Sequence, residues 1–387
     1  MVKNNIKICL IASHTSVHTL RWLKFLIKKG FEVHLISFSP TRIEGAIVHS
    51  LNAKFSFGSL SKISPALPVL LDLRFIPKIK KILKKIKPDI LHGHYLTCYA
   101  FFAACTGFHP LIVSIWGSDI STDPDKSWLL MLIVKYVFKK SDLVHVGDNV
   151  SKSRAIELGC RPNKIFIQPW GIDISKFSPD KKNQSLKEKL TIVDNYSIIN
   201  TRCLDIKKYH VDIFIKAIPY VLKKIKNIKF IFAAKGQSKS ELQQLVNQLN
   251  VKKNVLFLDG IPQKEMAKYL SSVDLCVDTY FPNNNKGGGG VGLSTMEAMS
   301  CATPQIMPQT PSMLKVNNWF KGLSYKCGDP EDLAKKIIYL LSDKKTMAEV
   351  GLKSRKSALK FFDLEKNMND WKKVYYKLIK NKNNPSI

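Results

Sequence analysis

The chain has 387 residues, and 45% of them are hydrophobic, which is ample for packed cores. A single core stops growing at about 250–300 residues, so this length indicates two domains. The 61 Lys and Arg against 30 Asp and Glu leave a net charge of +31, which favours anionic partners such as nucleic acid, phospholipid headgroups or phosphorylated substrates. Most of this excess is lysine spread along the whole chain, so compositional bias explains the charge equally well.

The eight cysteines form no C-x-x-C pair, and most of them lie within apolar runs. This pattern is typical of buried thiols in a reducing cytosol and argues against a disulfide framework or a zinc site. No signal peptide is visible, because residues 6–11 are predicted as a first strand. The longest apolar stretch, 128–138, is interrupted by Lys135 and is too short to span a bilayer. We therefore expect a cytoplasmic protein.

Short apolar runs alternate with longer amphipathic segments from one end of the chain to the other. The runs predicted as strands begin at Ile6, Val33, Ile90, Leu111, Leu143 and Lys164, and then at Ile198, Lys229, Val255, Leu275 and Pro304. The segments between them have helical spacing. Strands separated by helices indicate parallel α/β sheets with right-handed crossovers, and two such series indicate two Rossmann-like domains facing across a cleft.

The domain boundaries follow from the polar, lysine-rich stretch 171–189, which contains Ser178-Pro179-Asp180. We expect a first domain over residues 1–172 and a second over 173–362. A helix over 363–387 is expected to cross back to the first domain. Ligands of such sheets bind at the carboxyl ends of the strands, so the functional residues should follow strands directly.

Residues 75–87 form a basic amphipathic stretch in which four apolar residues share one helical face: Ile79, Ile82, Leu83 and Ile86. One interpretation is a surface helix packed on the first sheet. The other is contact with an anionic membrane, where each nearby lysine contributes about 1 kcal/mol.

Asp123-Pro124-Asp125 has the D-x-D form of some metal sites. The proline and the apolar run that follows it favour a helix start instead, and no metal is expected.

Four glycines, 287–290, lead through Val291 and Gly292 into the predicted first turn of a helix, and that turn carries Glu297. Backbone amides at a helix start, reached through glycines, form a cradle for a diphosphate, with the acid in the first turn. The alternative is purely local. Ser294 and Glu297 have the spacing of a capping box, in which the acid only reaches back to a backbone amide.

The chain resembles the retaining glycosyltransferases of family 4, which have the GT-B fold of two Rossmann-like domains. The resemblance extends over nearly the whole length and rests on these segments: 16–22 with 29–33 (SVHTLRW and KGFEV), 88–94 (PDILHGH), 114–119 (SIWGSD), 169–173 (PWGID) with Phe177, 201–202 with Lys207-Lys208, and 292–299 (GLSTMEAM). Each is weak alone, but six in the expected order are strong.

The resemblance implies a donor site in the second domain. Arg202 and Lys207, with Lys208 as the alternative, match the pair that binds the donor diphosphate. Glu297 matches the acid that holds the donor ribose. The remaining donor-site matches are Gly260 and Ile261 beside the nucleobase, and the cradle Gly289, Gly290, Val291, Gly292 and Leu293.

In this family a further acid that contacts the donor sugar usually occupies the position of Gly289. Because this acid is absent here, the identity of the donor sugar is left open, and the enzyme's activity is weakly in doubt. Asn284, Asn285 or Lys286 are candidates to replace it.

The first domain is expected to hold the acceptor. His94 matches a histidine beside the reacting sugar, while His92 is expected to be structural at its strand. His18 and Arg21 are predicted acceptor contacts, because the glycines usual after the first strand are absent. Asp119 is a third candidate, although it could equally cap the next helix.

These matches predict a retaining transferase that moves a sugar from a nucleotide-sugar donor to a saccharide or lipid-linked acceptor in envelope polysaccharide or glycolipid synthesis. No cofactor is expected beside the nucleotide sugar, with UDP or GDP favoured. The alternatives are a sugar-nucleotide epimerase or hydrolase, and a catalytically silent protein that binds polyanions or a protein partner. Nucleic acid is not expected as the main partner, because aromatic residues do not interleave with the basic runs.

Overall fold

The computed structural model describes residues 6–53, 66–281, 291–310 and 324–383, which divide into two compact units. The first unit comprises the described residues up to Gln168 together with those from Met368 onward. The second comprises the described residues from Pro169 to Asn367. The first division lies a few residues before the boundary expected at 172, and the second lies a few residues into the expected C-terminal helix.

The first unit is built on a parallel sheet in the order β3-β2-β1-β4-β5-β6-β7. Its strands are β1 (Lys7–Ile11), β2 (Glu32–Ser37), β3 (Ile47–Ser50), β4 (Ile90–His94), β5 (Leu111–Ser114), β6 (Leu143–Val146) and β7 (Ile165–Ile167). The order reverses between β1 and β4, which pair in the register Ile8 to Ile90. In a sheet of this kind ligands bind at the carboxyl ends of the strands beside that reversal.

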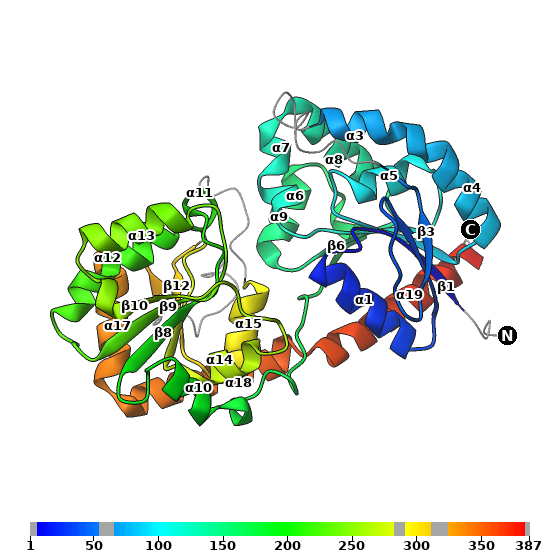
Figure 1. Cartoon of the computed structure of the whole chain (residues 1–387). Coiled ribbons are helices and arrows are strands. Elements are labelled where there is room, and N and C mark those ends of the chain that lie inside the picture. Colours follow the sequence, from blue (N-terminus) through cyan, green and yellow to red (C-terminus); the bar gives the residue numbers. More distant parts are fainter. Residues whose placement is uncertain (1–5, 54–65, 282–290, 311–323, 384–387) are drawn as a thin grey trace. The chain divides into compact units, whose positions relative to one another are not determined.

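Helices cover both faces of this sheet (Figure 1). They are α1 (Val17–Lys28), α3 (Leu67–Leu71), α4 (Ile76–Ile86), α5 (Tyr99–Cys105), α6 (Ser118–Ser121), α7 (Asp123–Lys126), α8 (Trp128–Lys140), α9 (Asn149–Glu157) and α19 (Leu364–Asn383). Helices α4, α5 and α8 share one buried cluster with alternate strand residues such as Leu91. Gly93 allows this packing, since a Cβ at this residue would come 2.7 Å from the backbone of Ala100 in α5. His92 and His94 point to the opposite face, where α1 and α19 pack.

The second unit repeats the scheme with a parallel sheet in the order β10-β9-β8-β11-β12-β13. Its strands are β8 (Tyr196–Asn200), β9 (Ile228–Phe232), β10 (Val255–Phe257), β11 (Leu275–Val277), β12 (Gln305–Pro308) and β13 (Ser324–Tyr325). Its helices are α10 (Gln184–Lys189), α11 (Ile206–Tyr209), α12 (Val211–Leu222), α13 (Lys239–Gln248), α14 (Met266–Ser272), α15 (Leu293–Ser300), α17 (Pro330–Ser342) and α18 (Lys344–Phe361). Here the strand order reverses between β8 and β11.

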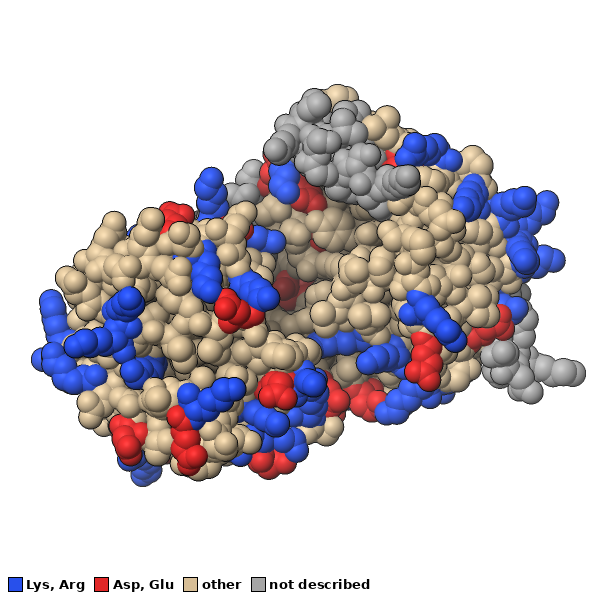
Figure 2. Space-filling model, viewed as in Figure 1, with Lys and Arg blue, Asp and Glu red and all other residues tan. Residues whose placement is uncertain are grey.

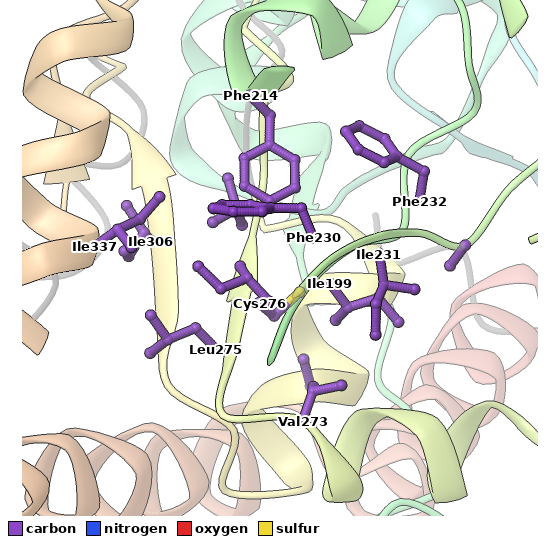
Figure 3. Packing of buried hydrophobic residues seen from close by; sticks show 14 of the residues in the cluster. Ile199, Phe214, Phe230, Ile231, Phe232, Val273, Leu275, Cys276, Ile306 and Ile337 are labelled. Atoms are coloured by element: carbon purple, nitrogen blue, oxygen red, sulfur yellow. The ribbon is translucent and has the colours of Figure 1, made fainter. Parts of the chain in front are cut away.

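The core of the second unit joins the central strands to α12 and α17 (Figure 3). Phe230 and Phe232 of β9 meet Phe214 of α12 with ring centroids 5.6 and 5.3 Å apart. Ile337 of α17 packs beside Ile306 of β12 in the same cluster. Such runs, buried on both faces, are typical of parallel sheets covered by helices.

The sequence predicted eleven of these strands correctly, along with the alternation of strands and helices. Two further strands, β3 and β13, were missed. Each lies at the edge of its sheet and is short, at 4 and 2 residues. An edge strand pairs on one side only, so it does not need a continuous apolar run.

The basic stretch forms α4, and its apolar face is already used inside the unit, since Ile79, Leu83 and Ile86 are buried. The interpretation as a helix packed on the first sheet is therefore confirmed. The D-x-D segment forms α7, with Pro124 in its first turn, which confirms the predicted helix start. No helix among the described residues is long and apolar enough to cross a membrane.

Candidate active site

Arg202 follows β8 directly, at the strand-order reversal of the second sheet, and its guanidinium is held by a carboxylate. The Nε of Arg202 donates to Oδ1 of Asp278 at 2.7 Å, and Nη2 donates to Oδ2 of the same group. Asp278 follows β11, the strand next to β8. The two side chains are only 15% and 4% exposed, so this is a buried bidentate ion pair.

The remaining lone pairs of Asp278 are also used. Its Oδ1 accepts from the backbone N–H of Tyr280 at 2.9 Å, and its Oδ2 accepts from the hydroxyl of Thr295 in α15 at 2.9 Å. Burial alone would raise the pKa of Asp278, but the Arg202 charge and these hydrogen bonds lower it below its usual value. The carboxylate is therefore ionised and fully bonded.

Arg202 lies against the amino end of α15. The N-cap of this helix is Gly292, and a Cβ at that position would come 2.7 Å from Nη2 of Arg202 and 3.0 Å from Nη1. A helix start carries a partial positive charge and free backbone N–H groups. The guanidinium and the helix start thus concentrate positive charge at one point, where an anion can bind and Asp278 balances part of the charge.

Glu297 is buried in the second turn of α15, so the prediction that the first turn carries an acid is wrong. The capping-box alternative is also wrong, because the helix begins with Gly292 as its N-cap and Ser294 is already inside it. The Oε1 of Glu297 instead accepts from the side-chain amide of Gln263 at 2.9 Å.

The predicted cradle lies only partly within the described residues. Gly289 and Gly290 fall outside them, as do the candidate replacements Asn284, Asn285 and Lys286. Val291 and Leu293 are half-buried and pack against the core of the second unit.

The two lysines after Arg202 differ in their surroundings. Lys207 is exposed in α11, and no ion pair involving it is found in the described part of the chain. Lys208 lies over the ring of Tyr209, 5.2 Å from its centroid. Of the two, Lys207 is the freer to reach a ligand.

Gly260 and Ile261 lie in the loop after β10. Gly260 has φ +88°, a conformation that favours glycine, and the alkyl chain of Lys235 passes close beside it. Ile261 packs against the core of the second unit. Within the described part of the chain, the predicted donor residues therefore lie in the loops and helices that follow the carboxyl ends of the strands of this sheet.

In the first unit, His94 ends β4 and is completely buried. Neither of its ring nitrogens has a hydrogen-bond partner among the described residues. It is surrounded instead by rings, with centroids 5.4 Å from Trp22, 4.7 Å from His92 and 5.5 Å from Trp116. Buried polar groups are rarely left unsatisfied in proteins, and those that are call for an explanation such as a ligand. Burial, with the nearby His145 and His18, lowers the pKa of His94 to about 3.

The three predicted acceptor residues lie near His94 to different degrees. His18 in α1 contacts the ring of Trp116, with centroids 5.1 Å apart, and so shares this neighbour with His94. Arg21 lies one turn further along α1, and its charge acts with burial to lower the pKa of His18 to about 4.

Asp119 is fully buried, and its oxygens accept from the backbone N–H groups of Leu96, Trp116 and Gly117 at 2.8–3.2 Å. Burial raises its pKa to about 7, although these hydrogen bonds lower it. The carboxylate thus holds the loop that carries Trp116. The alternative that Asp119 caps the next helix is wrong, because Asp119 lies inside α6 and the N-cap of that helix is Gly117. Direct contact between Asp119 and an acceptor stays a prediction.

A continuous row of hydrogen bonds runs under His94 across the sheet. Nε1 of Trp22 donates to the hydroxyl of Tyr375 at 2.8 Å, and Nδ1 of His92 lies 2.9 Å from that hydroxyl. Nε2 of His92 lies 2.8 Å from the Ser114 hydroxyl, which lies 2.9 Å from Nδ1 of His145. Nε2 of His145 ends the row at the carbonyl oxygen of Gln168, 2.7 Å away.

Chemistry fixes the direction of this row. A carbonyl oxygen only accepts and an indole N–H only donates, so each hydroxyl and imidazole between Trp22 and Gln168 accepts from one side and donates to the other. Both histidines are then neutral, with their proton on Nε2. Burial lowers the pKa of His145 to about 4 and that of His92 well below its usual value, which agrees with this assignment. The prediction that His92 is structural is confirmed.

Sequence reasoning missed Asp278 and the row of hydrogen bonds. Asp278 could have been found, because it follows the predicted strand that begins at Leu275. Tyr375 could not, since its partner His92 lies 283 residues away in the sequence.

Two Rossmann-like units, each with its candidate residues beside the strand-order reversal, have the architecture of the GT-B glycosyltransferases. Residues 7–147 match the family Glycosyl transferase 4-like, and residues 183–357 match Glycosyl transferases group 1. The chain belongs to the group 1 glycosyltransferases.

Among known proteins, the chain is 23% identical over 378 residues to N-acetyl-alpha-D-glucosaminyl L-malate synthase of Bacillus anthracis, covering 94% of each chain. It is 22% identical to the UDP-Gal:alpha-D-GlcNAc-diphosphoundecaprenol alpha-1,3-galactosyltransferase of Escherichia coli, again over 94% of each chain. Anabaena HepE, solved in complex with UDP and glucose, shares the fold at a TM-score of 0.78 with 17% identity, over 96% of this chain and 100% of that one.

Proposed function

We propose that the protein transfers a sugar from a nucleotide-sugar donor to a saccharide or lipid-linked acceptor, with retention of the anomeric configuration, in envelope polysaccharide or glycolipid synthesis. The observation that carries this proposal is Arg202 held over the amino end of α15, the helix that also carries Glu297. A guanidinium beside free helix N–H groups suits a diphosphate, which is the leaving group of such donors.

The proposal assigns each donor residue a role. Arg202, Lys207 and the amides that begin α15 stabilise the charge that grows on the leaving diphosphate. Glu297 holds the ribose, its carboxylate oriented by Gln263. Gly260 and Ile261 lie beside the base. UDP and GDP are the favoured leaving groups, and UDP is the nucleotide named in the HepE complex. No metal or prosthetic group is proposed.

The first unit is proposed to serve the acceptor and the reacting sugar. His94, neutral and without a hydrogen-bond partner in the described chain, offers one donor and one acceptor to a sugar hydroxyl. The ring of Trp116 beside it suits the apolar face of a sugar. His18 and Arg21 are proposed to contact the acceptor. In the retaining step, the leaving diphosphate assists attack from its own face, so the protein supplies no general base.

A lipid-linked acceptor is supported by the Escherichia coli relative, whose name specifies a diphosphoundecaprenol acceptor. We accordingly propose a cytoplasmic protein that works at the inner face of the membrane. Figure 2 shows lysine and arginine side chains gathered over α4, where they are available to an anionic surface.

Thermal unfolding with UDP, GDP, ADP and CMP tests the donor site. A nucleotide at a hundredfold excess over its Kd stabilises by about 2.7 kcal/mol, which raises Tm by several degrees. We expect one diphosphate to stabilise the wild type and the control Glu241→Gln, an exposed acid on α13, but not Glu297→Gln.

The exposed thiol of Cys203 provides a second readout, because it lies next to Arg202 in the chain. The stabilising nucleotide should slow its labelling by a thiol reagent. If no nucleotide stabilises the protein or protects Cys203, the transferase proposal is refuted. Conversion of a donor without any acceptor would instead identify an epimerase.

A further inference from the structure

A cavity of about 590 Å³ opens in the first unit away from the residues of the candidate active site. Its lining comes from α4, from the segments before β4 and β5, and from α19: Lys80, Leu83, Lys84, Lys87, Pro88, Asp89, Thr106, Gly107, Phe108 and Ile379. Figure 1 shows α4 and the end of α19 on the same side of this unit. The volume lies within the usual range for ligand sites, about 300–1,000 Å³.

The cavity lies at the opposite edge of the sheet from His94. Asp89 precedes β4 and Phe108 precedes β5, so these residues mark the amino ends of the strands, whereas His94 marks a carboxyl end. A ligand here would not compete with a substrate at His94. None of the residues proposed for catalysis or donor binding lines this cavity.

One wall of the cavity is cationic. Lys80 and Lys84 lie one turn apart on one side of α4, Lys87 is the C-cap of this helix, and all three are exposed. No carboxylate forms an ion pair with any of them within the described residues. Asp89, the only acid in the lining, accepts a hydrogen bond from the backbone N–H of Lys7 at 2.8 Å. The lining therefore carries three positive charges against one negative charge.

The rest of the lining is largely apolar, with Leu83, Phe108 and Ile379 provided by three different segments. Three unpaired ammonium groups beside apolar side chains suit a ligand that has a negatively charged head and a hydrocarbon tail. A free anion would contact only the ammonium groups and would leave the apolar side chains without a ligand. An uncharged lipid would leave the lysines without a partner.

We propose that this cavity binds an acidic phospholipid, with the phosphate at Lys80, Lys84 and Lys87 and the upper acyl chain against Phe108 and Ile379. Because the apolar face of α4 is buried in the core, the helix does not insert into the bilayer and holds one lipid at its side instead. The proposal does not depend on the transferase activity, since it concerns residues outside that site.

Helix α4 offers a matched pair of variants. Lys80→Gln/Lys84→Gln removes two charges from the cavity, whereas Lys81→Gln/Lys85→Gln removes two exposed charges from the same helix outside it. The measurement is co-sedimentation with phosphatidylcholine vesicles with or without phosphatidylglycerol. A lysine at an anionic surface contributes about fivefold to binding wherever it lies on that surface, so a diffuse attraction would weaken both variants equally.

We expect wild-type binding to require phosphatidylglycerol, and the cavity variant to bind about tenfold more weakly than the control variant. Ile379→Asn should also weaken binding without any change in charge. Dihexanoyl phosphatidylglycerol, but not glycerol phosphate, should compete for the site.

Equal losses in the two lysine variants would overturn the proposal in favour of diffuse attraction. Full competition by glycerol phosphate, with no effect of Ile379→Asn, would identify a site for free phosphate instead. Circular dichroism and melting curves of each variant exclude unfolding as the cause of a loss. Nucleotide stabilisation should persist in all of them, so failure here leaves the transferase proposal untouched.

Discussion

Replacing Asp278 with Asn tests the arrangement of the donor site most directly. The substitution keeps the shape of the side chain but removes the charge opposite Arg202. The carboxylate now accepts two bonds from Arg202, one from Thr295 and one from a backbone N–H. An amide group cannot replace them all, because its nitrogen donates and would face another donor.

The expected destabilisation is large because both partners are buried. Removing one partner of a buried ion pair costs about 3–5 kcal/mol, since the other charge stays in the interior uncompensated. For a unit of this size each kcal/mol lowers Tm by about 2–4 °C, so we expect a loss of roughly 6–20 °C. Asp274→Asn is the matched control: this carboxylate precedes β11 and accepts from Ser197, and no cationic side chain pairs with it among the described residues.

The nucleotide response should change in the opposite direction. In the wild type, Asp278 already balances part of the charge of Arg202, so a diphosphate gains less from neutralising it. In Asp278→Asn, the diphosphate supplies the missing negative charge. We therefore expect the same nucleotide to raise Tm more in this variant than in the wild type or in Asp274→Asn.

Two results would refute this reasoning. The first is a loss of less than 1 kcal/mol in Asp278→Asn, measured by urea unfolding. The second concerns the double variant with Arg202→Met, which removes the stranded cation and should recover part of the stability. If the double variant is no more stable than Asp278→Asn alone, the cost does not arise from an uncompensated charge.

Three further predictions follow from the same contacts. Gly292→Ala should lose about 1–3 kcal/mol and the nucleotide response, because its Cβ would meet the guanidinium of Arg202 at 2.7 Å; an unchanged melting curve with nucleotide would contradict this. Tyr375→Phe should lower the free energy of unfolding by about 1–3 kcal/mol for each of the two buried side chains that lose a hydrogen bond to this hydroxyl. The control Tyr376→Phe, at a residue 38% exposed, should change urea unfolding little. The free energy of unfolding should fall as the pH drops from 6.5 towards 4, because in this range His145 is protonated only in the unfolded chain. In urea titrations the slope from this residue should approach about 1.4 kcal/mol per pH unit, and a flat profile would count against a buried neutral imidazole.

Much of the fold was predictable because parallel strands covered on both faces appear in the sequence as apolar runs. The apolar runs Ile198–Ile199 and Leu275–Val277 each predict a strand, although neither run shows that the two strands pair. Arg202 was found through the resemblance to the family 4 glycosyltransferases, whereas Glu297 was also indicated by a local signal, a helix with its preceding glycines. Such signals are local, so they survive in a single sequence.

The rest of the site depends on contacts between residues far apart in the sequence, which no local pattern predicts. Asp278 lies 76 residues from the guanidinium that it holds, and its role appears only once β8 and β11 are adjacent. The start of α15 was predicted too late in the chain, because Ser294 is a residue type typical of an N-cap but Gly292 occupies that position. Sequence composition proposes several starts for a helix, and packing against Arg202 selects one of them.

The row of hydrogen bonds from Trp22 to Gln168 has a consequence for how the chain is made. One of its two hydroxyls comes from Tyr375, more than 200 residues after the last strand of the first sheet. During synthesis at about 5–20 residues per second, the ribosome completes the entire second unit before this hydroxyl emerges. Until then His92 and the indole of Trp22 lack their buried partner. The unit that begins the chain is therefore the last to reach its native state, and a nascent chain stalled before Tyr375 should hold a finished second unit beside an unfinished first one.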